Sequence, residues 1–258
     1  MTRVPLPAGF LRLPIAHRAL HDRAQRRPEN SPAAIRAAIA AGYAIEIDLQ
    51  LSQDGIPIVF HDEALDRLTA EHGPLNAHPA ATLSRIRLND ADDPIPTLHQ
   101  VLALVAGQVP LLIEIKDQSL SLSQTDGQLE AATAALLATY QGPVAVMSFN
   151  PHSIAQMARL APQIPRGLTT ASYDPAAWAP LPAETCAHLR AIPDYNTTRS
   201  SFISHEASDL ARRRVADLKS QGAAILCWTI RTPAQEQTAR HIAHNITFEG
   251  YAAPLAGA

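Results

Sequence analysis

Cysteine is scarce in this chain of 258 residues, which contains only Cys186 and Cys227. These two residues are far apart, so they form neither a metal-ligand pair nor a redox motif. Two distant cysteines are compatible with a reducing compartment. The chain also has no run of basic residues, and its formal net charge is −3. A nucleic-acid-binding surface is therefore not expected.

Long apolar segments are absent as well. No stretch reaches the roughly 18 apolar residues that a helix needs to span a bilayer, so we expect no transmembrane segment. The N-terminal segment 1–13 is interrupted by Pro5 and Pro7 and lacks the long apolar core of a signal peptide. These absences predict a cytoplasmic protein.

The residues that are present are typical of a globular protein with a sizeable core, because 47% are hydrophobic and only 17% are charged. Short β-rich runs alternate with helical stretches along the whole chain. The expected strands cover residues 13–17, 44–51, 111–115, 144–147, 167–169, 223–230 and 245–248, and the expected helices cover residues 32–41, 98–106, 128–140, 151–160, 206–221 and 233–241. This order predicts a single domain, residues 1–258, with the α/β fold of a (β/α)8 TIM barrel; a doubly wound sheet is the alternative.

Three segments do not follow the alternation. Asp54-Gly55 is a turn signal that leads into the apolar run 56–60, which predicts a hairpin-like extension of the second strand. Residues 63–93 are polar and rich in turn signals, and we interpret them as a small insertion after the second strand and a candidate lid. Residues 172–203 are rich in proline and predict no clear element.

Two carboxylates lie two residues apart inside an apolar run, at Glu46 and Asp48. In a strand this spacing places both side chains on one face, about 6–7 Å apart. Neighbouring carboxylates repel each other and lose hydration at an apolar layer, so a divalent cation between them is the simplest expectation. Taken alone, such a pair is more often part of an exposed face or a salt bridge.

Further polar and aromatic residues follow the ends of other expected strands. They are His17 and Arg18, Glu114 and Lys116, Ser148 and Phe149, and Trp228. In a barrel the C-terminal strand ends meet at one mouth, so this distribution predicts an active site there. Each of these residues alone also has a structural interpretation: His17 could be a core histidine, and Phe149 and Trp228 could be core aromatics. Likewise, His61-Asp62 could be a turn. We expect Glu29-Asn30 only to shape the start of the first helix, and His21 to be one of nine histidines without a pattern.

Eight short motifs together resemble those of the glycerophosphodiester phosphodiesterases. They are His17-Arg18, Pro28-Glu-Asn30, Glu46-Ile-Asp48, His61-Asp62, Leu65-Asp-Arg67, Ile95-Pro-Thr-Leu98, Glu114-Ile-Lys116 and Trp228-Thr229. The resemblance implies a TIM barrel with a small insertion after the second strand, which matches residues 63–93. It also implies hydrolysis of a small-molecule glycerophosphodiester to glycerol 3-phosphate and an alcohol, with a divalent cation as cofactor.

The resemblance implies roles for individual residues. Glu46, Asp48 and Glu114 would be the metal ligands, His17 and His61 the acid–base pair, and Arg18 and Lys116 the phosphate-binding cations. Phe149 and Trp228 are candidates for contact with the glycerol or alcohol part of the substrate. Three carboxylates without cysteine or histidine favour Mg²⁺, Ca²⁺ or Mn²⁺ over zinc. The sequence leaves open which histidine is the acid, whether the 2-hydroxyl of glycerol or water attacks, and the oligomeric state.

Two positions depart from the family pattern. Ala19 follows His17-Arg18 where the family usually has glycine, and alanine costs little there unless the backbone requires a positive φ. Residues Thr247-Phe248-Glu249-Gly250 replace the usual Thr-Asp-x-Pro, which affects one edge of the predicted site and its alcohol specificity.

Two other functions remain open. A lysophospholipase D would need an apolar path beside the site, which residues 172–203 could supply. A catalytically silent barrel would bind phosphodiesters without turnover, although the presence of all the acid, base and ligand positions argues against it.

Overall fold

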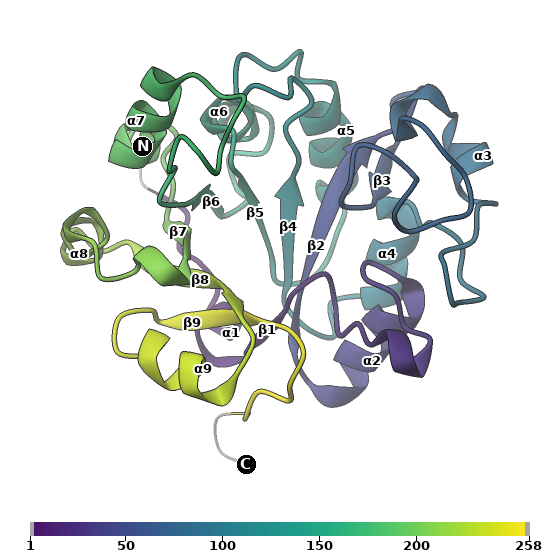
Figure 1. Cartoon of the computed structure of the whole chain (residues 1–258), viewed down its shortest axis with the longest axis horizontal. Helices are drawn as coiled ribbons and strands as arrows, with labels where there is room; N and C mark the ends of the chain where they lie inside the picture. Colours follow the sequence, from purple (N-terminus) through teal and green to yellow (C-terminus); the bar gives the residue numbers. More distant parts are fainter. Residues whose placement is uncertain (1–2, 256–258) are drawn as a thin grey trace.

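A closed ring of eight parallel strands forms the centre of the computed structural model, which describes residues 3–255 (Figure 1). The strands are β1 Ile15–Ala16, β2 Ala44–Leu51, β4 Leu111–Ile115, β5 Val144–Ser148, β6 Arg166–Thr170, β7 Phe202–Glu206, β8 Ala224–Ile230 and β9 Asn245–Phe248. The short strand β1 pairs in parallel with both β2 and β9, which closes the ring. The predicted TIM barrel is therefore confirmed, and the doubly wound alternative is wrong.

The helices lie around the outside of this ring, apart from α1, which packs across one end of it (Figure 1). They are α1 Gly9–Arg12, α2 Pro32–Ala41, α3 Ala80–Leu83, α4 Leu98–Val105, α5 Gln128–Leu137, α6 Pro151–Leu160, α7 Ala183–Ala191, α8 Arg213–Ser220 and α9 Pro233–Ala239. As the sequence indicates, the Ser31 side chain caps α2, Pro32 occupies its first turn, and Gly42 ends it in the left-handed conformation. Within residues 3–255, none of the helices has the length and apolarity required to cross a bilayer.

One end of the barrel is closed by apolar packing. Phe10 from α1 is fully buried against side chains from the first residues of several strands, among them Ile15, Leu112 and Leu226. The Asn245 amide of β9 donates hydrogen bonds to the carbonyls of Phe10 and Leu13, which fixes α1 there. Because this N-terminal end is closed, polar chemistry is confined to the opposite, C-terminal mouth.

The predicted extension of β2 is present. Strand β3, Pro57–Val59, runs antiparallel to β2, with Leu49 opposite Val59. The segment 63–93 follows β3 and lies on the outer side of β2 and α4 (Figure 1). Its apolar residues, among them Leu65 and Leu83, form a separate cluster with Ile58 and Phe60 from β3 and the residue after it, so the segment packs as a small unit against β3.

The expected helix 206–221 is wrong in its first half. Residues Phe202–Glu206 form β7, a 3₁₀ turn follows at Ala207–Asp209, and α8 begins only at Arg213. The strand is hidden in the sequence because it contains Ser204 and His205. The His205 side chain is fully buried outside the barrel wall, where Thr170 and Asp209 supply its hydrogen-bond partners. The segment 172–203 also contains an ordered helix, α7.

Candidate active site

Three carboxylates converge on the inner face of β2 and β4. Asp48 lies directly opposite Glu114 in the parallel pairing, and Glu46 precedes Asp48 by two residues on the same face. The exposed fractions of Glu46, Asp48 and Glu114 are only 1%, 2% and 7%. One oxygen of each lies within 4.8 Å of the others. This buried, all-oxygen donor set fits a hard divalent cation such as Mg²⁺ or Ca²⁺.

The pKa values of Glu46 and Asp48 are shifted in opposite directions. Burial, followed by the neighbouring Asp48 and Glu114, raises the pKa of Glu46 well above its usual range. Burial acts in the same direction on Asp48, but the positive charges of Lys116, His61 and Arg18 outweigh it and lower the pKa of Asp48. The charged form of Glu46 is thus destabilised by burial and by the two neighbouring carboxylates, and a cation between the three groups would offset this repulsion.

Two permanent cations lie beside these carboxylates. The Lys116 Nζ is 3.0 Å from Glu114 Oε1 and 3.5 Å from Asp48 Oδ1. The Arg18 Nε is 3.6 Å from Asp48 Oδ2, and another nitrogen of its guanidinium donates to Glu29. A guanidinium and an ammonium at one mouth are suited to bind phosphoryl oxygens.

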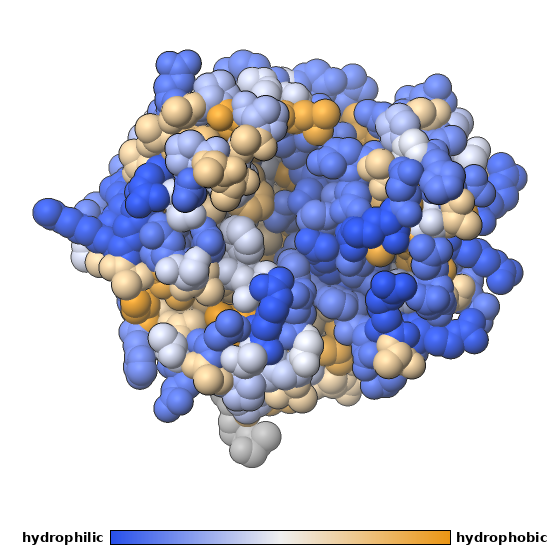
Figure 2. All heavy atoms as spheres, viewed as in Figure 1, coloured by the Kyte–Doolittle hydropathy of each residue, from blue (hydrophilic) through white to orange (hydrophobic). Residues whose placement is uncertain are grey.

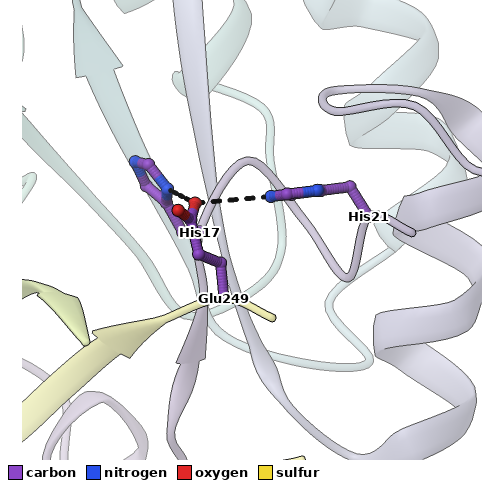
Figure 3. A group of neighbouring side chains, drawn as sticks. All are labelled: His17, His21 and Glu249. Atoms are coloured by element: carbon purple, nitrogen blue, oxygen red, sulfur yellow. Dashed lines mark hydrogen bonds and ion pairs between the residues drawn. The ribbon is translucent and has the colours of Figure 1, made fainter. Parts of the chain in front are cut away.

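Each predicted acid–base histidine has a carboxylate on its Nδ1. His61 Nδ1 lies 2.6 Å from Asp62, and His17 Nδ1 lies 2.6 Å from Glu249 (Figure 3). In both rings Nε2 is therefore the nitrogen left for a ligand. Burial lowers the pKa of His17, the Arg18 charge adds to this effect, and Glu249 opposes it.

A chain of ion pairs supports His61 from the insertion. Arg67 donates to both oxygens of Asp62 and to both oxygens of Glu29. Glu29 in turn accepts from Arg18, so the segment 63–93 is connected through Arg67 and Glu29 to Arg18 at the mouth. The sequence interpretation did not include this role of Glu29.

Asn30 is a second residue whose role exceeds the one expected from sequence. Its Nδ2 donates to Asp48 Oδ2 at 2.9 Å, and its Oδ1 accepts from the backbone N–H of Asp48 at 3.2 Å. The side chain therefore fixes the orientation of a candidate metal ligand. The Pro28-Glu-Asn30 motif was the available signal, but the position of Asn30 depends on its left-handed backbone, with a φ of +58°.

The turn after β1 also has left-handed backbone, at Arg18 and Ala19, whose φ values are +49° and +64°. This turn directs the Arg18 N–H to Glu46 Oε2 at 2.7 Å and the Ala19 N–H to the Glu46 carbonyl at 2.9 Å. Because the backbone at position 19 has a positive φ, alanine is more strained there than glycine would be. The chain keeps alanine at a position where glycine would adopt the backbone without strain.

The aromatic side of the mouth contains residues from three segments. The Phe149 ring lies 5.4 Å from Trp228 and 5.3 Å from Trp178, measured between centroids. Figure 2 shows hydrophilic residues on the side of the hollow toward β2 and β3 and more apolar residues on the side toward β6 and α7. A groove of about 670 Å³ between β8, α9 and the segment 206–211, which precedes α8, shares Trp228 with this mouth.

All nine predicted site residues line a single cavity of about 60 Å³. They are His17, Arg18, Glu46, Asp48, His61, Glu114, Lys116, Phe149 and Trp228. Thr169 and Thr247 also line this cavity. The residues predicted from sequence therefore converge on one cavity, but the prediction did not include Glu249 or His21, which lie at its edge.

The sequence matches the Glycerophosphoryl diester phosphodiesterase family over residues 17–245. A glycerophosphodiester phosphodiesterase of Caldanaerobacter subterraneus is 31% identical over 166 residues, which cover 60% of this chain and 65% of that protein. Glycerophosphodiester phosphodiesterase 1 of Bos taurus is 40% identical over 100 residues, which cover 34% of this chain and 29% of that protein. The matched regions thus span less than two thirds of these relatives.

A similar solved structure is a phosphodiesterase of Oleispira antarctica in complex with the product sn-glycerol-3-phosphate. Its TM-score is 0.74 at 25% sequence identity, and the alignment covers 92% of this chain and 93% of that one.

Proposed function

Because the chain belongs to the glycerophosphoryl diester phosphodiesterase family, we propose that it hydrolyses glycerophosphodiesters to glycerol 3-phosphate and an alcohol. One observation carries the proposal: three buried carboxylates, two cations and two carboxylate-bound histidines line the same cavity. The complex of the Oleispira phosphodiesterase with sn-glycerol-3-phosphate supports the identity of the product.

Glu46, Asp48 and Glu114 would hold a divalent cation, with Mg²⁺ or Ca²⁺ favoured by the oxygen donors. When bound, such a cation neutralises charge on phosphoryl oxygens and polarises the phosphorus centre. Arg18 and Lys116 would bind the remaining phosphoryl oxygens, since both lie beside the carboxylates.

His17 and His61 would move the protons. One Nε2 accepts the proton of the attacking oxygen, which belongs to the 2-hydroxyl of glycerol or to water. The other Nε2 donates a proton to the departing alcohol oxygen, so no alkoxide has to leave. If the 2-hydroxyl attacks, this step gives a cyclic phosphate. Water would then add to its phosphorus and break the bond to the 2-oxygen, with the two histidines exchanging roles, to give glycerol 3-phosphate. Positioned general acid–base groups of this kind accelerate a reaction by about 10²–10⁴-fold.

The test is release of glycerol 3-phosphate from a water-soluble glycerophosphodiester in the presence of Mg²⁺ or Ca²⁺. We expect Glu46→Gln and His61→Ala each to lower kcat by at least about 10²-fold. Glu130→Gln is the matched control, because Glu130 is an equally buried carboxylate on α5 whose oxygen accepts from Thr125, away from the cavity. Full activity of both site variants would contradict the assignment, as would binding without turnover under every divalent metal.

One observation favours a lysophospholipase D as the second candidate. Trp178, from the segment 172–203, packs on Phe149 and extends the apolar side of the mouth. A lysolipid would place its chain against these rings. Trp178→Ala would then weaken turnover of a lysolipid more than that of a water-soluble diester, and equal effects on both substrates would exclude the lipid path.

A further inference from the structure

We propose that Glu249 is a positioning residue for His17: its carboxylate accepts the Nδ1–H bond and thereby presents Nε2 to the substrate. This inference rests on the proposed acid–base role of His17 and adds a residue to it. Glu249 lies in the segment 247–250, where the chain departs from the family pattern described above.

The strand register brings the two side chains together. Ala16 of β1 pairs with Phe248 of β9, and the His17 N–H donates to the Phe248 carbonyl at 2.9 Å. His17 and Glu249 are the next residues of these parallel strands, so their side chains leave the barrel mouth on the same face. The resulting Nδ1 to Oε2 distance is 2.6 Å.

The Glu249 carboxylate is itself fixed by other partners. Arg231 Nε donates to Oε1 at 2.7 Å, and His21 Nε2 lies 3.5 Å from Oε2 (Figure 3). The hydrogen bond from His17, together with the nearby His21 ring, holds the pKa of Glu249 well below its usual range, so the acceptor is an anion. A fixed anion sets both the tautomer and the ring orientation of the histidine that donates to it.

The other predicted acid–base histidine provides an internal comparison. His61 Nδ1 contacts Asp62 at the same distance of 2.6 Å, and Arg67 fixes Asp62 as Arg231 fixes Glu249. The two histidines therefore have equivalent supports, although Asp62 is the adjacent residue and Glu249 comes from the other end of the barrel sequence.

The same three side chains also resemble a metal site, because His17, His21 and Glu249 offer two nitrogens and an oxygen within 4.8 Å. The contacts favour the hydrogen-bonded description. A distance of 2.6 Å joins a donor and an acceptor directly, and the second oxygen of Glu249 is held by Arg231.

The first test reads the tautomer without requiring activity. In protein labelled with ¹⁵N at histidine, correlation spectra assign the protonated ring nitrogen of His17 in wild type and Glu249→Ala. We expect neutral His17 to carry its proton on Nδ1 in wild type and to lose this preference in Glu249→Ala. An unchanged tautomer in the variant would overturn the proposal.

The second test is a double-mutant cycle on turnover. Glu249→Ala is expected to lower kcat by about 10–10²-fold while KM changes by less than about twofold. Glu249→Gln, which keeps an acceptor oxygen but not the charge, should lie between wild type and Glu249→Ala. Because Glu249 acts through His17, the double variant His17→Ala/Glu249→Ala should be no slower than His17→Ala alone.

Glu236→Gln is the matched control for the cycle. Glu236 is a buried carboxylate on α9 whose partners are Arg240 and Tyr251, so its effect should multiply with that of His17→Ala. Two results would contradict the positioning role of Glu249. In the first, the losses of kcat in His17→Ala and Glu249→Ala multiply in the double variant. In the second, Glu249→Ala keeps the wild-type kcat although His17→Ala is inactive. A fully active His17→Ala would instead overturn the proposed role of His17, and the tautomer would still report on Glu249.

Discussion

Ala19 shows how a single backbone angle controls this site. Its φ of +64° is in the left-handed region, and its side chain is only 2% exposed. Left-handed backbone costs a residue with a Cβ about 1–2 kcal/mol, whereas glycine avoids this cost. This turn nevertheless allows the Arg18 N–H to donate to the Glu46 carboxylate. The strained backbone thus lies beside a candidate metal ligand and fixes its orientation.

We predict that Ala19→Gly changes the free energy of unfolding by no more than about 1 kcal/mol. Relief of strain is offset by the loss of a buried methyl, about 0.8 kcal/mol, and by greater freedom of the unfolded chain. Ala38→Gly, which removes a buried methyl from α2, should cost about 1–2 kcal/mol because glycine also weakens a helix. Urea denaturation compares the two, and equal losses would show that position 19 is unstrained.

Glu46 should destabilise the metal-free protein increasingly as pH rises. Its pKa is raised above the usual 4.5, so the folded state retains a proton that the unfolded state releases above about pH 4.5. Stability is therefore lost as pH rises from there through the folded pKa. In thermal unfolding with a chelator present, the melting temperature of Glu46→Gln should rise relative to that of wild type as pH increases. A difference that is constant with pH would contradict the raised pKa.

Among the elements, the insertion 63–93 contributes to the site through one side chain, Arg67. Its side chain is 47% exposed, and screening by solvent limits what its ion pairs add to stability to about 1 kcal/mol or less. The guanidinium contacts Asp62 and Glu29 in a planar, forked geometry that lysine cannot reproduce. Its effect should thus appear in turnover more than in stability.

We predict that Arg67→Ala and Arg67→Lys lower kcat by about 10–100-fold while the melting temperature changes little. Without Arg67 the Asp62 carboxylate is free to rotate, and His61 loses its fixed orientation. Arg87→Ala is the control, because Arg87 lies in the same insertion and pairs with the exposed Asp92 instead. Wild-type turnover of the Arg67 variants would show that Asp62 needs no support.

The elements that the sequence predicts are those with regular apolar patterns. Strand β2 and helix α2 have clear patterns and clear ends, and their positions are confirmed. Strand β7 was not found because His205 and Ser204 interrupt its apolar pattern, and the hydrogen-bond partner of buried His205, Thr170, comes from another strand. Tertiary contacts of this kind leave no local signal.

The same distinction applies within the site. Side chains at strand ends, such as Glu46 and Lys116, were predictable because the barrel topology alone brings them together. Glu249 and Asn30 were not, because their roles depend on the pairing of β1 with β9 and on left-handed backbone. His21 lies four residues after His17, and only the folded turn places it beside Glu249.

At the scale of the whole molecule, the fold separates stability from function. Apolar packing under α1 closes one end of the barrel, and the opposite mouth gathers buried like charges that repel each other. The ionised form of Glu46 is destabilised in such a site until a cation binds, so we expect cation binding and folding to be coupled there. This coupling can be measured without any assay of turnover.

We therefore predict that Mg²⁺ or Ca²⁺ stabilises the folded protein. At about 100 times its dissociation constant the cation adds about 2.7 kcal/mol, which corresponds to a rise in melting temperature of about 5–10 °C for a chain of this size. The rise should grow with pH, because the cation displaces the proton of Glu46. Glu46→Gln should lose most of the gain, and Glu130→Gln should retain it. An equal gain in Glu46→Gln and wild type would place the cation elsewhere, since an oxygen of Glu46 lies within 4.8 Å of an oxygen of each of the other two carboxylates.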